Sequence, residues 1–562
     1  MEGCGYKDMT EREPMNFIDR IVANDLATGK VTKVHTRFPP EPNGFLHIGS
    51  AYAINISYSI AKKYNGKFNL RFDDTNPLKE DISYVNAIIE DMNWLGVKYE
   101  GPYYGSDYNE QIYEYAVYLI KKGLAYVCDL SPDEIREYRG TLTEPGKNSP
   151  YRDRSVEENL ELFERMRAGE FEEGEKVLRA KIDMASPNIV MRDPVIFRII
   201  KAEHYRTGNQ WCIYPMYDFA HPIQDYIEGI THSLCSNEFV NNRPLYEWTL
   251  ENLDLPNPLP QQIEFGRLNI TGVVTSKRYL KQLVDSGVLE GWDDPRLPTI
   301  QGMRRRGYTQ DAIFAFLNEI GVPKAESTVD VEMLEHFVRQ DLNEKATCVM
   351  AVLDPLKVVI TNWDEDHVEY VDADNSYTNP NLGSRKVPLT REIYIEREDF
   401  MENPPKKYNR LVLGGEVRLR HGYFIKCNEV IKDEQGNIIE LHCTYDPETK
   451  SGSGFTGRKV KGTIHWVSAS HGLPCTVRLY ESLFNEQPTE ENLLESINPN
   501  SKVVLNSIVE PSILDFVKDG VTHFQFLRNG YFVWDNKLAA LDNLVFNRIV
   551  TLRSSYRHPN KG

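Results

Sequence analysis

The sequence predicts a multidomain protein that combines an α/β domain, built on a parallel sheet, with an all-β region at its C-terminal end. The chain has 562 residues, which is more than one hydrophobic core usually organises. Near the N-terminus, strand-like and helix-like apolar patterns alternate, as they do in strand–helix–strand units. Beyond about residue 348, alternating apolar patterns bounded by turn residues predominate. We therefore expect roughly three to five domains.

The composition is that of an ordinary globular protein, with 41% hydrophobic and 26% charged residues. No apolar run is long enough to span a membrane, and residues 1–17 lack the apolar core of a signal peptide, so we expect a cytoplasmic protein. The eight cysteines lie far apart without zinc-ligand spacing, which predicts free thiols and no structural metal. A net charge of −18 argues against unselective coating of nucleic acid but leaves room for local basic faces.

The first strand and helix are predicted to form a nucleotide pocket at residues 37–53. Alternation from Val34 to Phe38 indicates a strand, three prolines stiffen its exit, and Asn43-Gly44 is a turn dipeptide. A helix is expected to begin near Ile48, where its free N–H groups suit a phosphate. The groups expected to help there are His47, Gly49 and Ser50.

The next segment completes a right-handed parallel unit. A helix to about Tyr64 ends at Asn65-Gly66, and Phe68 to Phe72 alternate as a strand. Ligands of such sheets bind at the carboxyl ends of the strands, where Asp73 and Asp74 fall. A second helix follows at about 82–95.

Later segments have less regular patterns. Residues 101–209 are predicted to form an inserted domain, after which the parallel sheet is expected to resume at Trp211 to Tyr214. Residues 266–345 are mostly helical, and the acidic stretch 364–374 is interpreted as a loop. Lys277, in the sequence VTSKRYL, is a candidate to match the charge of a triphosphate from a mobile loop.

Seven motifs spread over nearly the whole chain resemble class I glutaminyl-tRNA synthetases. They are TRFPPEPNGFLHIGSA, NLRFDDTNPLKED, YRGTLTEPGKNSPYRDRSVEENL, LRAKIDMASPNIVMRDP, CIYPMYDFAH, GWDDPRLPTI and VKGTIHWVSA. The resemblance implies a monomer with a Rossmann catalytic domain, an inserted acceptor-stem-binding domain, a helical subdomain and two anticodon-binding antiparallel β-barrels. The implied boundaries are 1–105 and 211–265 for the catalytic domain, 106–210 for the insertion, 266–345 for the helical subdomain, 346–403 with 486–562 for the proximal barrel, and 404–485 for the distal barrel.

The resemblance also implies the substrates and the residues that bind them. The substrates would be L-glutamine, ATP with Mg²⁺, and tRNA(Gln). Catalytic roles would fall to His47, Ser50, Ser276 and Lys277. ATP would contact Glu41, Pro42, Asn43, His47, Ile48, Gly49, Ser50, Ala51, Tyr52, Ala53, Ser236, Arg267, Leu268, Thr275, Ser276 and Lys277. Glutamine would contact Asp73 through its ammonium and Tyr217 through its amide, with Cys235 and Gln262 nearby. The tRNA would contact Asn241, Arg410, Arg418, Arg420, Gln525 and Arg528.

The sequence departs from the family pattern at a few positions. Ser50 replaces the last histidine of the HIGH motif, Tyr52 replaces a lysine and Thr275 a methionine. On the tRNA side, Asn241 replaces an aspartate and Cys348 an arginine. Because of these changes, the alternative remains that the chain is a divergent paralogue that binds tRNA but has weak or lost aminoacylation activity.

Two further alternatives stand beside the glutamine enzyme. Glutamyl-tRNA synthetase resembles the chain in RFDDTNP, but that family has an arginine where this chain has Cys235, and Gln262 is typical of glutaminyl enzymes. A neutral pocket suits an amide, whereas a carboxylate requires a cation. A small-molecule nucleotidyltransferase would need no β-rich C-terminal region of this size.

Overall fold

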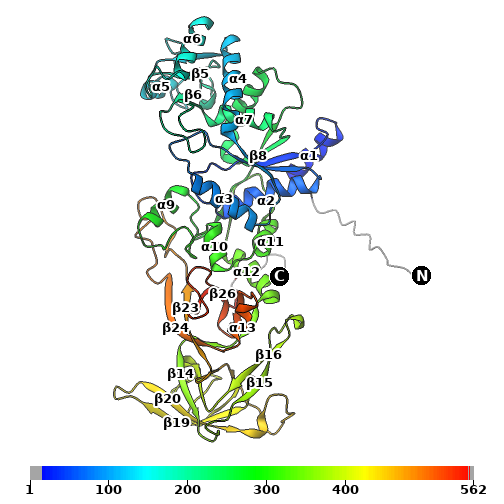
Figure 1. Cartoon of the computed structure of the whole chain (residues 1–562), viewed down its shortest axis with the longest axis vertical. Helices are drawn as coiled ribbons and strands as arrows, with labels where there is room; N and C mark the ends of the chain where they lie inside the picture. Colours follow the sequence, from blue (N-terminus) through cyan, green and yellow to red (C-terminus); the bar gives the residue numbers. More distant parts are fainter. Residues whose placement is uncertain (1–14, 555, 557–562) are drawn as a thin grey trace, which may run out of the picture. The chain divides into compact units, whose positions relative to one another are not determined.

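The computed structural model describes residues 15–554 and residue 556. The predictions made for the N-terminal stretch 1–14, including the free thiol of Cys4, lie outside these residues. The chain forms two compact units (Figure 1). One contains Met1–Asn269 and Leu317–Val329, and the other contains Ile270–Phe316 and Asp330–Gly562.

A parallel sheet lies at the centre of the first unit, in the order β1-β2-β3. Thr36 of β1 pairs with Phe68 of β2, so the two strands end side by side. The predicted strand–helix–strand pattern is confirmed. The elements are α1 (Phe17–Ala27), β1 (His35–Phe38), α2 (Ile48–Lys63), β2 (Lys67–Phe72), α3 (Ile82–Trp94) and β3 (Glu100–Tyr104).

A second parallel pair, β8 (His232–Ser236) and β9 (Gln261–Phe265), lies beside β1. The Thr231 N–H donates to the carbonyl oxygen of His35 over 2.9 Å. Two helices, α7 (Tyr217–Ile227) and α8 (Arg243–Asn252), flank β8 in sequence. The carboxyl ends of β1, β2 and β8 therefore belong to one region of the unit, where the parallel-sheet rule places ligands.

An antiparallel sheet in the order β4-β5-β6-β7 forms the core of the insertion. Ile213 pairs with Ile199, so β7 belongs to this sheet. The expectation that the parallel sheet resumes at Trp211 to Tyr214 is therefore wrong, because WCIY completes the insertion and the parallel pairing returns only at β8. The elements are α4 (Asn109–Lys121), β4 (Ala125–Cys128), α5 (Pro132–Arg139), α6 (Val156–Arg167), β5 (Val177–Ala180), β6 (Val195–Ile199) and β7 (Ile213–Pro215).

Helices precede the strand-rich part of the second unit, as the sequence predicts. They are α9 (Lys277–Asp285), α10 (Ile300–Arg306) and α12 (Val331–Lys345), with α11 (Gln310–Ile320) between the last two. Leu280 and Leu283 of α9 are buried with Leu483 and Phe484 of the later chain. The loop that carries Lys277 therefore leads into a packed helix.

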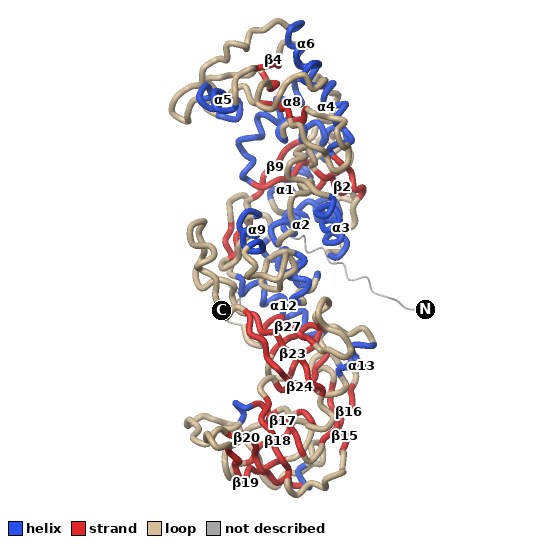
Figure 2. The backbone as a smooth tube through the Cα atoms, turned by 60° about the vertical axis from the view of Figure 1, so that its left-hand side comes forward, coloured by secondary structure: helices blue, strands red, loops and turns tan. Residues whose placement is uncertain are grey.

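Two seven-stranded sheets form most of the rest of the second unit, visible as the strand-rich part of Figure 2. One has the order β12-β25-β26-β27-β23-β24-β13 and the other β21-β18-β19-β20-β14-β17-β22. Most pairs are antiparallel, but β12·β25, β14·β20, β18·β21 and β23·β27 are parallel. The strands of the first sheet are β12 (Thr347–Val349), β13 (Ala351–Val352), β23 (Leu473–Tyr480), β24 (Lys502–Val509), β25 (His523–Phe526), β26 (Gly530–Trp534) and β27 (Val545–Val550). Those of the second are β14 (Pro355–Ile360), β17 (Glu392–Glu396), β18 (Glu416–Leu419), β19 (Phe424–Lys432), β20 (Ile438–Asp446), β21 (Thr463–Ile464) and β22 (Val467–Ser468).

The strand pairing divides the C-terminal chain differently from the expected boundaries. β14 and β17 pair with the strands expected in the distal barrel, although 346–403 was assigned to the proximal one. β23 pairs within the other sheet, although 404–485 was assigned to the distal barrel. The acidic segment is also not a loop throughout, because β15 (Glu369–Asp374) pairs with β16 (Ser384–Leu389). Burial alternates along β15, as in a strand with one buried face, where a loop was expected.

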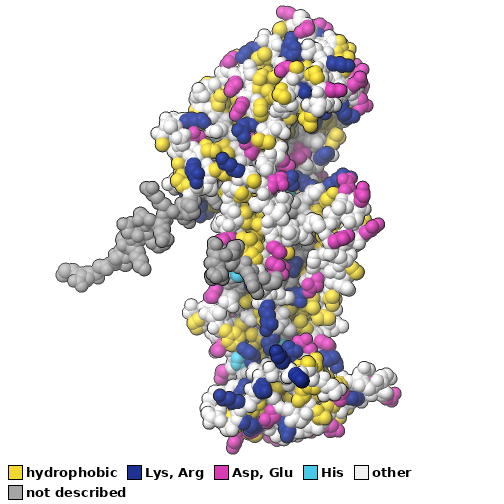
Figure 3. All heavy atoms as spheres, turned by 180° about the vertical axis from the view of Figure 1, so that it is seen from behind, with side chains coloured by type: hydrophobic (Ala, Val, Ile, Leu, Met, Phe, Trp, Pro, Cys, Tyr) yellow, Lys and Arg dark blue, Asp and Glu magenta, His cyan; other side chains and the backbone are white. Residues whose placement is uncertain are grey.

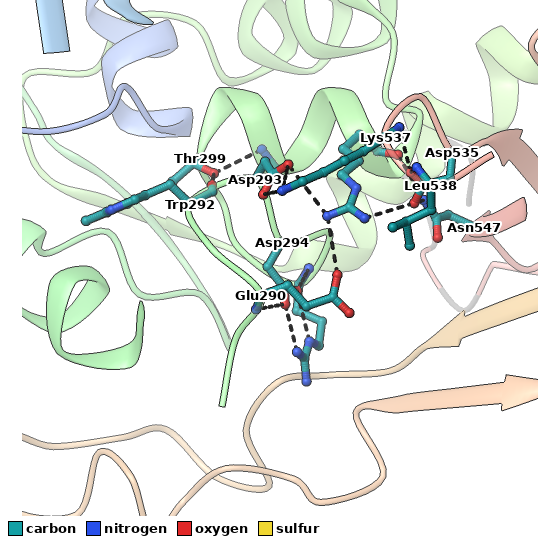
Figure 4. Close-up of polar contacts among 12 residues, drawn as sticks. Glu290, Trp292, Asp293, Asp294, Thr299, Asp535, Lys537, Leu538 and Asn547 are labelled. Atoms are coloured by element: carbon teal, nitrogen blue, oxygen red, sulfur yellow. Dashed lines mark hydrogen bonds and ion pairs between the residues drawn. The ribbon is translucent and has the colours of Figure 1, made fainter. Parts of the chain in front are cut away.

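A polar network fixes the α10 segment to the first of these sheets (Figure 4). Arg305 of α10 donates to the Asp535 carboxylate over 3.1 Å, and Asn547 of β27 donates to the same carboxylate over 2.7 Å. Lys537 forms an ion pair of 3.0 Å with Asp293. Because Asp535 is buried, its hydrogen bonds hold α10 against the sheet more firmly than a surface ion pair would.

Charges of both signs are spread over the surface. On the face drawn in Figure 3, Lys and Arg side chains lie among Asp and Glu on the strand-rich part of the chain, despite the net charge of −18. No helix within the described residues is long and apolar enough to cross a membrane.

Candidate active site

The turn after β1 is held by a capping box at the start of α2. His47 is the N-cap, and its Nδ1 accepts from the Gly49 N–H over 3.1 Å. The Ser50 hydroxyl accepts in return from the His47 N–H over 3.2 Å. A Cβ at Gly49 would lie 2.9 Å from the His47 ring, which explains the need for glycine. Ser50 thus satisfies a backbone group that the helix start would otherwise leave open.

The turn is also joined to the end of β2. The Asp73 N–H donates to the Pro40 carbonyl oxygen over 3.0 Å, and the Asp81 N–H donates to that of Pro42 over 3.1 Å. Because these bonds fix the backbone of both loops, the predicted nucleotide turn and the predicted ammonium ligand Asp73 belong to one site. The structure brings these two sets of predicted residues together.

Asp73 is a buried carboxyl group with few donors. Its oxygen accepts from the Thr75 hydroxyl over 3.2 Å. Burial raises the pKa of Asp73 to about 7, and the charge of Arg71 only partly opposes this effect. Burial likewise raises the pKa of the neighbouring Glu80 to about 9. Near neutral pH neither carboxyl group is therefore fully ionised, and a cation placed beside them would favour the ionised form.

Asp74, the next residue, has a positioning role. Its carboxylate accepts from the Ser106 N–H over 2.6 Å, from the Ser106 hydroxyl over 2.7 Å and from Tyr205 over 3.1 Å. His204 Nε2 lies 2.9 Å from the Asp74 carbonyl oxygen. Two residues at the end of the insertion thus fix the Asp73 loop. Sequence reasoning placed Asp74 at the strand end but did not identify these partners, because they come from more than 100 residues away.

The predicted amide ligand lies near Asp73. Tyr217 is the first residue of α7, and its ring lies 4.8 Å from that of His221 and 5.7 Å from that of Phe239. Burial holds the pKa of the Tyr217 hydroxyl well above its usual range, and the charges that act on it include those of Arg37 and Asp73. The hydroxyl is therefore a neutral hydrogen-bonding group.

Cys235 and Gln262 belong to the same surroundings. Burial raises the pKa of the Cys235 thiol to about 12, so the thiol is neutral. The Gln262 amide donates to the Phe239 carbonyl oxygen over 3.1 Å and to Glu264 over 3.0 Å. Gln262 thus supports the segment that carries Phe239, the ring that contacts Tyr217.

A network that sequence reasoning missed lies beside these residues. Arg37 Nε and Arg71 Nη2 both donate to Asp225 Oδ1, over 3.0 and 2.7 Å. Ser233 and Tyr246 donate to Oδ2 over 2.7 and 2.8 Å. Burial alone would raise the pKa of Asp225, but the two arginines hold it well below its usual range. An arginine within a predicted buried strand was the available signal, since a buried cation requires a partner.

The remaining predicted ATP residues are in varied surroundings. Ala51 and Tyr52 are buried in α2, and the Tyr52 hydroxyl donates to the Gly321 carbonyl oxygen over 3.3 Å. Ser236 donates to Glu238 over 2.7 Å, and Arg267 lies 3.7 Å from the same carboxylate. Because the side chains of Ala51 and Tyr52 are buried, only the backbone atoms of these two residues would be left to contact a ligand. Leu268 is buried in β10 (Leu268–Ile270).

The loop residues Thr275, Ser276 and Lys277 belong to the second unit at its α9 helix. Ser276 is the N-cap and Lys277 the first helical residue, and both are exposed. A lysine at a helix start is not there to complement the helix dipole, which favours anions at that end. The expected contact of Lys277 with the phosphates of ATP stays a prediction.

The predicted tRNA residues form local clusters in the second unit. Arg528 donates to both oxygens of the buried Asp399, over 2.6 and 2.7 Å, and Arg410 lies 3.3 Å from the same carboxylate. Gln525 accepts from the Cys348 thiol over 3.4 Å. Arg410 and Arg528 therefore both contact the carboxylate of Asp399. Cys348, where the family has an arginine, donates instead to Gln525, which is itself a predicted tRNA contact.

Arg418 and Arg420 lie at the end of β18. Arg418 donates to three oxygens, including the Thr449 carbonyl over 2.8 Å, and its guanidinium lies 4.3 Å from the Phe424 ring centroid. Arg420 donates to the Tyr377 hydroxyl over 2.9 Å. Asn241, in the first unit, is exposed, and its carbonyl oxygen accepts from Asn188 over 2.8 Å.

No group of three or more His, Cys, Asp or Glu side chains in the described part of the chain is arranged to hold a metal ion. The acids of the pocket are spread along the loops instead.

Comparisons with known proteins agree with this arrangement. Residues 33–344 match the family model of the catalytic domain of class I tRNA synthetases (E and Q). Residues 346–446 and 463–535 match two models of the anti-codon binding domain of the same class. These three models together span most of the chain.

Curated relatives match over nearly their whole length. A protein named "Glutamine--tRNA ligase" from Clostridium perfringens is 58% identical over 545 residues, covering 96% of this chain and 98% of the relative. Proteins of the same name from Clostridioides difficile and Proteus mirabilis are 57% and 56% identical, covering 97% and 98% of this chain and 99% of each relative. The chain therefore belongs to the class I tRNA synthetases of the glutamate and glutamine type.

Proposed function

We propose that this chain is a glutamine–tRNA ligase. It activates L-glutamine with ATP to glutaminyl-adenylate and transfers the glutaminyl group to the 3′-terminal adenosine of tRNA(Gln), releasing AMP and diphosphate. The observation that carries the choice of amino acid is the neutral thiol of Cys235 beside Tyr217, with a pKa of about 12. The relatives' name agrees with this choice.

Selection of glutamine over glutamate follows from charge. A glutamate side chain would bring a carboxylate, which is costly to bury without a cation. The cation whose charge acts most strongly on both Tyr217 and Cys235 is Arg37, and Asp225 already pairs with it at 3.0 Å. A neutral amide is therefore the better match for the hydroxyl and thiol groups of this pocket.

The amino-acid backbone would be held at the end of β2. Asp73 accepts the ammonium group, which converts a carboxyl of pKa about 7 into a paired carboxylate. Asp74 keeps the loop in place through Ser106 and Tyr205. Binding thus pairs a buried acid that lacks strong donors in the free protein.

The activation step needs positioning more than covalent help. A carboxylate oxygen of glutamine forms a bond to the α-phosphorus of ATP, and the bond to the leaving diphosphate breaks, taking its electron pair. The start of α2 offers N–H groups and its dipole to the nucleotide, and Gly49 allows close approach. The assignment of Thr275, Ser276 and Lys277 to the phosphates rests on the resemblance and stays a prediction. Mg²⁺ would arrive with ATP and screen its phosphate charge.

The tRNA would contact both the insertion and the anticodon-binding domains. The family models of residues 346–446 and 463–535 support the second contact. Arg418 and Arg420, each beside an aromatic ring, suit unstacked bases of an RNA loop. We expect a monomeric cytoplasmic enzyme.

Aminoacylation assays test the proposal directly. The wild type should charge tRNA(Gln) with glutamine and reject glutamate. Cys235→Arg should lower kcat/KM for glutamine by about 10²-fold or more, because it buries an unpaired cation beside the amide. Cys235→Ser, which keeps a small neutral group, is the matched control and should retain glutamine charging.

Other outcomes identify the alternatives. Charging of glutamate in preference to glutamine would indicate a glutamyl enzyme. Binding of tRNA without charging of either amino acid would indicate the paralogue, and Ser50→His would then show whether the missing histidine is the cause. Lys277→Ala should abolish the activation step and leave tRNA affinity nearly unchanged.

A further inference from the structure

Arg198 is an arginine of the insertion that lies beside the proposed glutamine pocket. It belongs to β6 and pairs with Tyr214 of β7, two residues before Met216. Met216 is the N-cap of α7, and Tyr217 is the first residue of that helix. Arg198 Nη1 lies 3.1 Å from the Met216 sulfur. The guanidinium therefore lies at the same end of the sheet as Tyr217.

The guanidinium of the half-buried Arg198 donates to no oxygen atom among the described residues. Its Nε is buried and has no hydrogen-bond partner among the described residues, and a thioether is a weak acceptor. Two other arginines of the insertion differ. Arg179 donates to the Asp193 carbonyl oxygen over 2.7 Å, and Arg192 donates to the Arg139 carbonyl oxygen over 2.8 Å. Arg198 is thus a cation with unused donor capacity.

Acidic groups of the pocket act on Arg198 without neutralising it. The charges that influence it come from Glu80, Glu41 and Asp73, but burial prevails and lowers the pKa of Arg198. Burial also raises the pKa of Glu80 to about 9 and that of Asp73 to about 7, so neither supplies a full negative charge near neutral pH. No salt bridge joins Arg198 to a carboxylate within the part of the chain that the structure describes.

We propose that Arg198 binds the α-carboxylate of the amino-acid substrate. An amino acid is a zwitterion, and the pocket holds groups of both complementary signs: Asp73 for the ammonium and Arg198 for the carboxylate. A carboxylate oxygen supplies the acceptor that the buried Nε lacks, and charge-assisted bonds of this kind are strong. Arg198 would thereby aim the attacking oxygen from a strand rather than from a mobile loop. This inference rests on the proposed function, because it assumes that the pocket takes an amino acid.

The test removes the charge from either partner. KM for glutamine is measured in tRNA charging, and Ki is measured for L-glutaminol, which has CH₂OH in place of the carboxylate. Arg198→Met should raise KM for glutamine about 10- to 100-fold, as expected for a lost charge-assisted bond. Ki for L-glutaminol should change less than about threefold, because the analogue lacks the group that Arg198 binds. Arg198→Lys should recover part of the affinity for glutamine.

Matched controls separate this role from general damage. Arg152→Met removes another cation of the insertion, one paired with Asp193 at 2.7 Å, and should leave the ratio of the glutamine and glutaminol constants unchanged. Thermal unfolding checks that each variant is folded. Equal losses for glutamine and L-glutaminol would overturn the proposal in favour of a structural role. A raised KM for tRNA with an unchanged KM for glutamine would overturn it in favour of a contact with the RNA backbone.

The two proposals fail in distinguishable ways. If the wild type charges glutamate instead of glutamine, the proposed function is wrong, and the same comparison is made with glutamate and its alcohol analogue. If Arg198→Met then weakens binding of glutamate but not of its alcohol analogue, the result would still support the contact between Arg198 and the α-carboxylate. If the wild type charges glutamine and Arg198→Met discriminates as the wild type does, only the inference about Arg198 is wrong.

Discussion

The sheet interior around Asp225 and the strand-end pocket around Asp73 hold buried aspartates in opposite states. Asp225 accepts from two arginines, a serine and a tyrosine, and its pKa lies well below the usual range. Asp73 accepts from the Thr75 hydroxyl, and burial raises its pKa to about 7. A buried acid with a full set of donors stabilises the fold, whereas one with few donors is available to a cationic ligand. From this difference we expect Asp225 to have a structural role and Asp73 a role in binding the substrate.

Asp225→Asn should give the largest loss of stability. The variant leaves Arg37 and Arg71 buried with one charge fewer between them, and breaking a buried ion pair in this way costs about 3–5 kcal/mol. Chemical denaturation followed by circular dichroism measures the effect. Asp133→Asn is the control, because its ion pair with Arg136 is exposed and should contribute less than about 1 kcal/mol. Equal stability of the two variants would contradict the structural role of Asp225.

Asp73→Asn should show the opposite behaviour. It removes the proposed ammonium partner, so kcat/KM for glutamine should fall about 30- to 5,000-fold, which corresponds to about 2–5 kcal/mol. Stability at pH 8 should not fall. The folded pKa of about 7 exceeds the ordinary aspartate value of 3.8, so ionisation of Asp73 opposes folding as pH rises between these values, and asparagine removes that cost. A variant that is less stable than the wild type but binds glutamine normally would show that Asp73 has a structural role, as Asp225 has.

The comparison also predicts a pH dependence. If the ammonium of glutamine pairs with the ionised form of Asp73, as we propose, kcat/KM for glutamine should rise about tenfold per pH unit up to about pH 7 and then level off. Thr75→Val removes a hydrogen bond that lowers the pKa of Asp73 and should move this midpoint to higher pH. Steady-state charging between pH 5.5 and 8.5 measures both profiles. A midpoint that is the same in both proteins would assign the titration to another group.

Much of this site was predictable from local patterns. The strand, turn and helix around His47 follow from apolar periods and from Asn43-Gly44, and Asp73 follows from its place at a strand end. The partners of Asp74 and Asp225 were not predictable in the same way, because His204 and Tyr205 for Asp74 and Arg37 for Asp225 come from distant segments that only the fold brings near. The unmatched guanidinium of Arg198 is likewise a property of packing, invisible in the letters RDPVIFR.

The same limit explains the errors in the strand-rich region and the insertion. WCIY has an apolar pattern that fits either a parallel or an antiparallel strand, and its pairing with β6 decides between them. The acidic letters of 364–374 suggested a solvated loop, yet Val371 and Ala373 alternate inward along β15. The order of the strands along the chain also did not reveal their pairing. β14 pairs in the sheet that contains β18 to β20, and β23 pairs in the sheet that contains β24 to β27.

Substitution of Ser50 gives the smallest expected effect. It tests whether this serine has a structural role, as Asp225 has, or acts on a ligand, as we propose for Asp73. Its hydroxyl accepts from the His47 N–H over 3.2 Å, so it is already used in the free protein, as the donors around Asp225 are. Ser50→Ala should cost about 0.5–1 kcal/mol of stability through the lost half of the capping box. Ser59→Ala, in an exposed position of the same helix, is the control and should cost less. If Ser50→Ala instead lowers kcat/KM for ATP more than tenfold with no change in stability, the hydroxyl acts on the nucleotide, and this serine belongs with Asp73 rather than with Asp225.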